Sequence, residues 1–377
     1  MRILVLNYEY PPLGGGAAPV SAELAERYAT RGHEVDVVTM GFGDLPRQEE
    51  RRGVRIFRVP CLRRRKERCS PIEQASYLAS AVFFLCRRLR TYSYDVVHVH
   101  FLIPTGIVAW WLKRRFGVPY ILTMHGSDVP GYNPDRFVFL HRFTRPLLRA
   151  VARHAARIVS PSRYLADLFK RRVDARRSMN VEHIPNGVDP SRFVPLPKER
   201  IILATGRLLP RKGFQHLIKA VSGTYVGYAV HIAGDGPVMT ELRRLAAGSA
   251  TPVVFHGWMD ATSDEYRDLL GRSAVFCLPS ERENASVSLL EAMSAGCAVI
   301  TSTASGCAET VSDTGITVPF GDVAALRDAL GRVLEGDTAR LMGERARKRV
   351  RREFSWDTII DRYRPWETAV EMHIPGN

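Results

Sequence analysis

The chain lacks the features that mark disulfide-rich, zinc-binding and membrane-spanning proteins. None of its six cysteines forms a Cys-x-x-Cys pair or has metal-ligand spacing to a histidine. The N-terminal residues MRILVLNY are typical of a strand rather than a signal peptide. The longest apolar run, 101–112, is interrupted by Pro104 and Gly106 and is shorter than the roughly 20 residues that span a bilayer. These absences predict a cytoplasmic protein, soluble or peripheral to the inner face of the cell membrane, whose cysteines are small buried residues.

The sequence also has no internal repeat and no low-complexity tract. Its 377 residues are enough for two or three domains with ample cores. Positive charge is concentrated in one half: residues 1–190 hold 31 Lys/Arg against 17 Asp/Glu, whereas residues 191–377 hold 23 against 22. This bias favours an anionic partner, such as a lipid surface, a nucleic acid or an anionic acceptor. Because no helix-turn-helix, zinc-finger or aromatic RNA-binding signature is present, a nucleic-acid-binding protein is the weaker interpretation.

Short apolar strands alternate with helical patterns along the whole chain. The predicted strands are 3–6, 35–40, 54–59, 95–100, 120–124, 158–160, 201–205, 228–233, 253–256, 274–278 and 298–300. A segment with three prolines, Pro190–Glu199, is the best linker candidate. The pattern predicts an α/β fold with two doubly wound, Rossmann-like domains.

The most informative stretch is 279–296, which reads PSERENASVSLLEAMSAG. It follows a predicted buried strand, 274–278, and its part 287–293 has the apolar spacing of a helix. Gly296 is a suitable C-terminal stop for that helix. The stretch is therefore predicted to be a strand-to-helix connection within a parallel sheet.

Two carboxylates flank the start of this predicted helix. Glu283 is expected in the loop and Glu291 about one turn inside the helix, with Ser286 and the amides near Val287 at the N-terminus. A helix N-terminus binds phosphate groups well. Carboxylates on either side of it predict binding of the two sugars that flank a diphosphate, as in a nucleotide sugar. The alternative is a pair of solvated glutamates without a ligand.

Three glycines, Gly14–Gly16, follow the first predicted strand and precede a helix expected over 19–30. Such glycines let a ligand approach the backbone closely. A dinucleotide-binding site is one interpretation, since Asp36 lies about twenty residues further on. However, the three glycines are adjacent rather than spaced as G-x-G-x-x-G, and Asp36 opens its strand instead of closing it.

These residues belong to a set of motifs whose order resembles that of retaining glycosyltransferases of family 4, which have the GT-B fold. The motifs are Gly14–Gly16, His125–Asp128, Asn186–Asp189, Gly206-Arg207 with Lys212-Gly213, Gly234–Gly236 and the Glu283/Glu291 pair. The resemblance covers nearly the whole chain. It implies an N-terminal acceptor domain (1–190), a C-terminal donor domain (191–357) with the active site between them, and a last helix (358–377) that crosses back onto the first domain.

The resemblance also implies roles for individual residues. Arg207 and Lys212 match the basic pair on the donor diphosphate, where fixed cations stabilise the charge that develops on the leaving group. Glu291 matches the carboxylate that holds the nucleotide ribose. Glu283 matches the one near the transferred sugar, where it binds hydroxyls or supports an oxocarbenium-like charge.

In the first domain, His125 matches the histidine at the sugar, and Gly15 and Gly16 match the loop that approaches the donor phosphates. The catalytic residues implied in this way are His125, Glu283, Arg207 and Lys212. The donor-binding residues are Gly15, Gly16, Arg207, Lys212, Glu283, Ser286, Val287 and Glu291.

The implied reaction is retaining transfer of a hexosyl group from a nucleotide-diphosphate sugar to a hydroxyl of a glycan or lipid-linked acceptor. No protein nucleophile is obvious, so we expect front-face attack in which the departing diphosphate deprotonates the acceptor. The family usually has Gly and an aromatic residue after the first glutamate, whereas Asn284-Ala285-Ser286 follow Glu283 here. The choice between GDP-mannose and a UDP-sugar therefore stays open. The sequence has no Asp-x-Asp motif, so no metal and no other cofactor is expected.

Alternatives remain within the same fold: a nucleotide-sugar epimerase or hydrolase, or an inactive sugar-nucleotide binder. The complete set of basic and acidic motif residues argues against the inactive binder. His98 and His100 alternate along one predicted strand, and we expect them to be buried under a helix rather than to bind metal. Two basic segments, 63–90 and 136–157, are candidates for docking on an anionic membrane, and Pro146 is expected to break or start a helix in the second.

Overall fold

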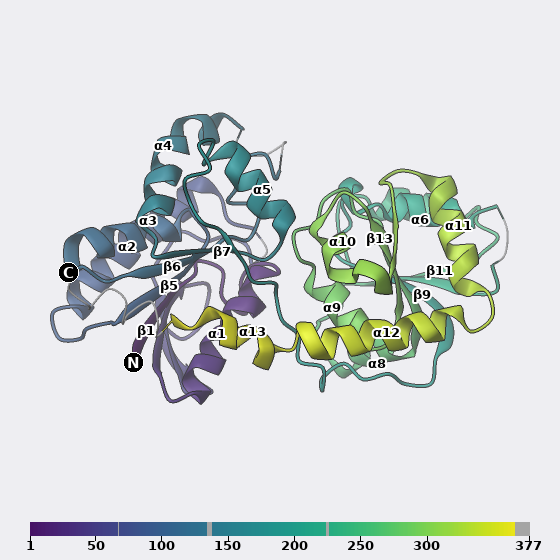
Figure 1. Ribbon diagram of the computed structural model, residues 1–377, viewed down its shortest axis with the longest axis horizontal. Helices are drawn as coiled ribbons and strands as arrows, with labels where there is room; N and C mark the ends of the chain where they lie inside the picture. The colour runs from purple at the N-terminus through teal and green to yellow at the C-terminus, as the bar shows by residue number, and fades with distance from the viewer. Residues whose placement is uncertain (67, 134–137, 224–225, 366–377) are drawn as a thin grey trace. The chain divides into compact units, whose positions relative to one another are not determined.

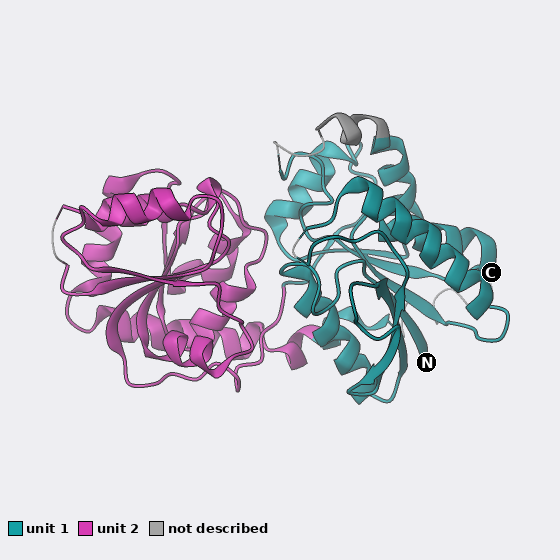
Figure 2. Cartoon of the chain, turned by 180° about the vertical axis from the view of Figure 1, so that it is seen from behind, with its two compact units in different colours: residues 1–185, 360–377 teal, residues 186–359 magenta. Residues whose placement is uncertain are grey.

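The computed structural model describes residues 1–66, 68–133, 138–223 and 226–365, and it divides the chain into two compact α/β units (Figures 1 and 2). Unit 1 comprises Met1–Pro185 and Ile360–Asn377, and unit 2 comprises Asn186–Ile359. The boundaries expected from the sequence, 190/191 and 357/358, differ from these by a few residues.

Unit 1 contains an eight-stranded sheet in the order β3-β4-β2-β1-β5-β6-β7-β8. Neighbouring strands are parallel, except that β3 runs antiparallel to β4 at the edge. The strands are β1 (Arg2–Leu6), β2 (Glu34–Met40), β3 (Gln48–Arg51), β4 (Val54–Val59), β5 (Val96–His100), β6 (Tyr120–Thr123), β7 (Arg157–Ser160) and β8 (Glu182–His183). The helices are α1 (Ala17–Thr30), α2 (Pro71–Arg88), α3 (Thr105–Phe116), α4 (Val138–His154) and α5 (Arg163–Arg172).

Unit 2 contains a six-stranded sheet in the order β11-β10-β9-β12-β13-β14, parallel throughout. Its strands are β9 (Glu199–Thr205), β10 (Ala229–Ala233), β11 (Val253–Gly257), β12 (Ser273–Leu278), β13 (Ala298–Ser302) and β14 (Ile316–Val318). Its helices are η1 (Pro210–Lys212), α6 (Phe214–Val221), α7 (Met239–Ala246), α8 (Asp264–Arg272), α9 (Val287–Ser294), α10 (Gly306–Val311), η2 (Ser312–Thr314), α11 (Val323–Leu334) and α12 (Thr338–Glu353). The last described helix is α13 (Trp356–Tyr363).

Both sheets have the doubly wound order, in which the chain starts at a central strand and builds outward on one side and then on the other. Helices cover both faces of each sheet (Figure 1), so the central strands are almost entirely apolar and buried, as in the fully buried β12. The order reverses between β1 and β5 in unit 1 and between β9 and β12 in unit 2. Doubly wound sheets bind their ligands at such a reversal, outside the carboxyl ends of the strands. The α/β, doubly wound fold predicted from the sequence is confirmed.

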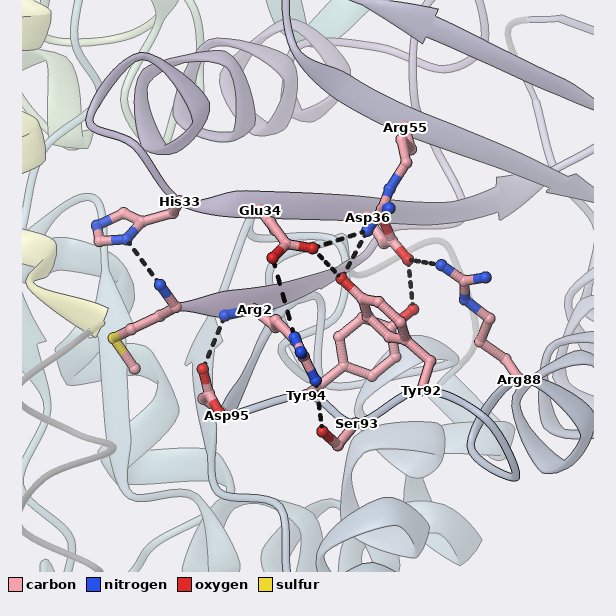
Figure 3. A network of polar contacts seen from close by, with 11 residues as sticks. Arg2, His33, Glu34, Asp36, Arg55, Arg88, Tyr92, Ser93, Tyr94 and Asp95 are labelled. Carbon is pink, nitrogen blue, oxygen red and sulfur yellow. Dashed lines mark hydrogen bonds and ion pairs between the residues drawn. The ribbon is translucent and has the colours of Figure 1, made fainter.

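A buried polar network in unit 1 accounts for Asp36 (Figure 3). The Asp36 carboxylate is fully buried and accepts hydrogen bonds from Arg55 Nε at 2.6 Å, Arg88 at 3.0 Å and the Tyr94 hydroxyl at 2.6 Å. These contacts hold β2 to the neighbouring strand β4 and to the end of α2. Because the carboxylate is buried and already accepts three hydrogen bonds within the protein, it cannot bind a ribose. The dinucleotide interpretation of Gly14–Gly16 and Asp36 is therefore wrong.

Pro146 lies inside α4, so the expectation that it breaks or starts a helix is wrong. Leu148 and Val151 from the same helix are fully buried in the core of unit 1. Gly106 of α3 faces this helix so closely that a Cβ there would lie 2.8 Å from Val151 Cγ1. We attribute the continuous helix to this packing, which outweighs the single backbone hydrogen bond that a proline removes.

The cysteines differ from expectation at three positions, because Cys61 and Cys69 are only partly buried and Cys86 is exposed. All six are free, and Cys277, Cys297 and Cys307 are buried as predicted. Cys86, however, is exposed, because α2 turns this position to the surface while its buried face is carried by Tyr77, Ala81 and Leu85.

The end of the described chain belongs to both units. Trp356, the first residue of α13, packs on Gly187, where a Cβ would lie 2.5 Å from the indole, and its amide donates to the Val188 carbonyl. The last helix, expected over 358–377, therefore begins two residues earlier, at Trp356, and the expected residues from 366 lie outside the described ones.

From Ile360 onward, α13 contributes to unit 1. Asp361 forms an ion pair with Arg31 at 2.8 Å, and the Tyr363 ring lies 5.2 Å from the His98 ring. The chain thus returns to its first domain at the C-terminal end, as the resemblance implied. No helix within the described parts of the chain has the length and apolarity needed to cross a membrane.

Candidate functional site

The strand-order reversal of unit 2 is lined by two loops that touch each other. One loop follows β9 and the other follows β12, and the Glu281 amide donates to the Arg211 carbonyl at 2.7 Å across them. Gly213, with φ of +76°, lies so close to the second loop that a Cβ would be 2.1 Å from the Pro279 carbonyl oxygen. Only glycine accommodates both this conformation and this approach. The motif glycine after Lys212 therefore serves to bring the two loops together.

This contact brings Lys212 and Glu283 into an ion pair, with Nζ donating to Oε1. Both side chains are largely buried, at 20% and 12% exposure. The Glu283 carbonyl also accepts the Gly306 amide at 2.9 Å, which fixes the loop against the start of α10. The sequence motifs assigned these two residues to different groups of a donor, and nothing in their spacing predicted the direct contact.

Arg207 follows β9 and is partly buried. Its loop rests on the turn after β10: the Leu208 amide donates to the Asp235 carbonyl at 2.8 Å. A Cβ on Gly234 would lie 1.9 Å from the Gly206 carbonyl oxygen. The motif Gly234–Gly236 therefore packs under the arginine loop and positions its backbone.

The N-terminus of α9 lies where the sequence predicted it. Ser286 is the N-cap, and its hydroxyl accepts the Leu289 amide at 3.4 Å, so Val287 is the first helical residue. Asn186 donates from its side chain to the Ala285 carbonyl at 2.8 Å and holds the preceding loop. The partial positive charge of this helix end suits a negatively charged group.

Glu291 lies one turn inside α9 and is almost fully buried. The Tyr266 hydroxyl donates to its Oε2 at 2.9 Å. Desolvation raises the pKa of Glu291 to about 7, although the hydrogen bond from Tyr266 and the charge of Arg192 oppose the shift. Tyr266 lies on α8, 25 residues earlier in the chain, and no sequence motif pointed to it.

In unit 1 the glycine-rich loop follows β1, at the strand-order reversal of that sheet. Gly16 is the N-cap of α1, which begins at Ala17 rather than at Pro19 as predicted. The Gly15 amide donates to Glu9 Oε2 at 3.2 Å. A Cβ added to Gly15 or Gly16 would meet nothing within 4 Å, so the protein itself leaves this space open.

His125 follows β6, and its backbone is fixed by Asp128. Asp128 Oδ1 accepts the amides of His125 at 3.0 Å and Gly126 at 2.9 Å, and Oδ2 accepts the Leu102 amide at 2.9 Å. The His125 ring is partly buried, lies 4.7 Å from the Phe101 ring and stacks on His100. Desolvation lowers the pKa of His125 to about 3, so the ring is neutral.

The predicted residues thus form two clusters, each at the carboxyl ends of a parallel sheet. Unit 2 brings together Arg207, Lys212, Glu283, Ser286, Val287 and Glu291, and unit 1 carries Gly15, Gly16 and His125. The residues that the sequence analysis missed are Glu9, Tyr266 and His100 as a partner of His125. Two doubly wound units with basic and acidic groups at their strand ends are the arrangement that the resemblance to GT-B glycosyltransferases implied.

Comparison with known proteins gives the family. Residues 14–192 match the model described as Glycosyltransferase Family 4, and residues 199–336 match the model described as Glycosyl transferases group 1. A 2-deoxystreptamine N-acetyl-D-glucosaminyltransferase of Streptomyces fradiae is 31% identical, covering 86% of this chain and 83% of that protein. The chain belongs to glycosyltransferase family 4.

Further similarities extend over nearly the whole chain. A GDP-mannose-dependent monoacylated alpha-(1-6)-phosphatidylinositol monomannoside mannosyltransferase of Corynebacterium glutamicum is 26% identical, with 96% of both chains covered. The structure of sucrose-phosphate synthase from Thermosynechococcus elongatus superposes with a TM-score of 0.83 at 23% identity, covering 98% of this chain and 99% of the other. Anabaena HepE in complex with UDP and glucose superposes with a TM-score of 0.75 at 19% identity, covering 98% and 100%. At these identities the superpositions establish the fold.

Proposed function

We propose that this chain is a retaining, metal-independent hexosyltransferase that uses a nucleotide-diphosphate sugar. The acceptor is a hydroxyl group of a glycan or of a lipid-linked substrate. Relatives support both choices of donor, since one is named for GDP-mannose and a structural neighbour was solved with UDP and glucose. Two relatives are named for their acceptors, 2-deoxystreptamine in one and a monoacylated phosphatidylinositol monomannoside in the other, and the second supports a lipid-linked acceptor.

The observation that carries the proposal is the arrangement at the strand-order reversal of unit 2. Lys212, from a loop 71 positions earlier in the chain, pairs with Glu283 just before the N-terminus of α9, and Glu291 is buried one turn inside the same helix. In our proposal Arg207 and Lys212 bind the diphosphate, together with the Ser286 and Val287 end of the helix. The buried Glu291 holds the ribose on one side of the phosphates.

On the other side of the phosphates, Glu283 binds hydroxyls of the transferred sugar. Its ion pair with Lys212 keeps the two side chains together at the position where the diphosphate meets the sugar. From unit 1, His125 hydrogen-bonds the sugar, and Gly15 and Gly16 approach the donor phosphates through their open space. The ion pair with Glu283 holds the lysine in place before the reaction begins, so its charge stabilises the leaving group with little reorganisation.

The proposed reaction is front-face displacement. The bond between the anomeric carbon and the diphosphate oxygen breaks while the acceptor oxygen bonds to the same face of that carbon. The acceptor proton passes to the departing diphosphate, which leaves as the nucleoside diphosphate. No protein group needs to bond to the sugar, and the configuration at the anomeric carbon is retained.

The proposal predicts that a nucleoside diphosphate stabilises the protein against heat in the presence of a metal chelator. A ligand at 100 times its dissociation constant adds about 2.7 kcal/mol to the free energy of unfolding. A thermal-shift screen of UDP, GDP and ADP, followed by the sugars of the successful base, identifies the donor. Absence of a shift with every nucleotide contradicts the proposal.

Product analysis then separates transfer from the alternative chemistry of the same fold. A transferase consumes the donor only when an acceptor is present, and the product carries the sugar with the donor's anomeric configuration. A hydrolase releases free sugar without an acceptor, and an epimerase returns a different nucleotide sugar.

We further propose that unit 1 docks on the anionic inner face of the cell membrane. Ile72 and Phe83 of α2 are exposed at 72% and 61%. On the adjacent α3, Trp110 and Phe116 each carry an arginine over the ring, Arg114 at 5.5 Å and Arg115 at 5.2 Å. A cavity of about 450 Å³ opens among the side chains of Ile107, Trp110, Trp111, Arg114 and Arg115. Aromatic rings with arginines at one surface are typical of a membrane interface.

The docking surface proposed here differs from the one predicted from the sequence. The predicted segment 63–90 contributes α2 to the proposed surface. Helix α3 was not predicted to be part of this surface, because its sequence is mostly apolar. Of the segment 136–157, residues 136–137 and the side chains before Thr144 lie outside the described residues.

Replacing Arg114 and Arg115 by glutamine is expected to weaken binding to anionic vesicles about 30-fold, because each arginine near the surface contributes roughly 1 kcal/mol. Co-sedimentation with vesicles that mix anionic phosphatidylglycerol with neutral phosphatidylcholine measures the binding affinity. Trp258→Ser, which removes a 70% exposed tryptophan from unit 2, is the control and should bind like the wild type. Equal binding of the wild type to anionic and to neutral vesicles contradicts the docking proposal.

A further inference from the structure

The ring of His125 is hydrogen-bonded to a second histidine that none of the sequence motifs includes. His100 Nδ1 lies 2.9 Å from His125 Nε2, and the rings stack with centroids 5.2 Å apart and planes inclined by 26°. His100 is the last residue of β5 and is fully buried. The contact therefore runs from the core of unit 1 to the partly exposed histidine after β6.

Both rings are neutral. Desolvation is the largest cause in each case, lowering the pKa of His125 to about 3 and that of His100 well below its usual value. A neutral imidazole carries one proton, so the proton in this hydrogen bond belongs either to His100 or to His125. The choice decides whether the other nitrogen of His125, Nδ1, is a donor or an acceptor.

The other nitrogen of His100 determines the choice. His100 Nε2 is buried and has no hydrogen-bond partner among the described residues. If His125 donated, this buried nitrogen would carry an N–H with no acceptor, and orphaned buried N–H groups are rarer than buried acceptors without a donor. The less costly state has the proton on His100 Nδ1, which donates to His125 Nε2.

We propose that His100 is a positioning residue that holds His125 as the tautomer protonated on Nδ1. In this tautomer His125 presents an N–H donor from a nitrogen for which the described residues provide no partner. Such a donor suits a sugar hydroxyl or a charged oxygen. The use of this donor in sugar transfer rests on the proposed function, whereas the tautomer itself does not.

His100 is itself held rigidly. Its ring stacks on His98 with centroids 4.5 Å apart. The two nitrogens of His98 contact the Tyr28 hydroxyl at 3.1 Å and Thr123 Oγ1 at 2.9 Å, so His98 is fully satisfied. Because the stacked His98 ring already has partners for both of its nitrogens, the hydrogen bond of His100 is directed toward His125. The tautomer of a histidine is set in this way by the bond that its other nitrogen makes.

Long-range ¹H–¹⁵N NMR of the full chain labelled on histidine tests the proposal without any substrate. His125→Gln identifies the His125 signals. In the wild type at neutral pH we expect His125 to be protonated on Nδ1. In His100→Leu the signals should move to the Nε2-protonated form, which free imidazole side chains prefer. In His100→Asn the side-chain amide replaces Nδ1–H, and the Nδ1-protonated form should persist.

Thr123→Val is the matched control, because it removes a hydrogen bond from the same buried cluster without touching His100 or His125. It should leave the His125 signals unchanged. A wild-type His125 protonated on Nε2 overturns the proposal, and so does an Nδ1-protonated His125 that His100→Leu fails to shift. If the leucine variant does not fold, the wild type and the asparagine variant still decide.

With a donor identified, His100→Leu should lower turnover about a hundredfold, and His100→Asn should recover most of it, since small misplacements of a substrate-binding group cost rates of this order. An unchanged turnover in His100→Leu, with the tautomer shifted, would show that the donor nitrogen has no part in transfer. If the NMR results are as expected but no chain transfers sugar, the proposed function fails and the tautomer assignment stands.

Discussion

Replacing Lys212 by methionine is expected to slow sugar transfer by a factor of about 10² to 10³, the usual cost of removing one fixed group that stabilises developing charge. Methionine keeps the length of the side chain and removes the charge that we assign to the diphosphate. Arg207→Met should act similarly, because we assign both cations to the same leaving group. Turnover at saturating donor is the measurement, since the effect should appear in kcat rather than in KM alone.

Lys219→Met is the matched control, because Lys219 is an exposed lysine on the neighbouring helix α6. It should transfer sugar at the wild-type rate. Lys212→Met also leaves Glu283 without its ionic partner, so loss of stability must be separated from loss of chemistry. The double variant Lys212→Met/Glu283→Gln removes the unpaired charge and should regain stability but not turnover. Near-normal rates in the folded single variants would contradict the assignment.

Glu291→Gln is expected to flatten the pH dependence of stability. The folded state keeps the Glu291 proton up to a pKa of about 7, whereas an unfolded glutamate loses it near 4.5. Between these values the folded chain binds the extra proton, so its stability falls as pH rises and levels off above about pH 7. The loss attributable to this carboxyl is about 3 kcal/mol. The measurement is the change in melting temperature between pH 5 and pH 8, in wild type and variant, without nucleotide.

A glutamine keeps the acceptor for Tyr266 and cannot ionise, so it should make the protein more stable than the wild type at the higher pH. Glu335→Gln, at the exposed end of α11, is the control and should follow the wild-type profile. Identical profiles for wild type and Glu291→Gln would show that Glu291 does not titrate as a buried carboxyl.

The parts of the fold that the sequence predicted well are those in which burial on both faces leaves a continuous apolar run. Strand β12 and the start of α9 were placed correctly because an apolar strand, a proline and a helix with an N-capping serine follow one another within one short segment. Strand β3 was missed, since its residues QEER lie at a sheet edge and carry no apolar pattern. The prediction for Pro146 was wrong because the packing that keeps α4 continuous comes from another helix, α3.

The site divides in the same way. Motif residues such as Lys212 and Glu283 were found because the family pattern carries them, yet their contact joins loops 71 positions apart. Tyr266 and His100 have no local signature: each is one aromatic side chain in an ordinary helix or strand. Their relevance comes only from a neighbouring strand or helix that sheet order brings alongside. Hydrogen bonds between segments that are distant in the chain are the part of a site that a single sequence does not predict.

The return of α13 to unit 1 has a consequence for how the chain is made. Asp361 and Tyr363 contact Arg31 and His98 in the first domain, but they are synthesised only after all of unit 2. At the usual speed of about 5–20 residues per second, a ribosome needs roughly 10 to 35 s to translate unit 2. During that time the emerging first domain lacks the ring that covers His98. The domain that leaves the ribosome first is therefore the last to be completed, and translation itself delays the closing of its core.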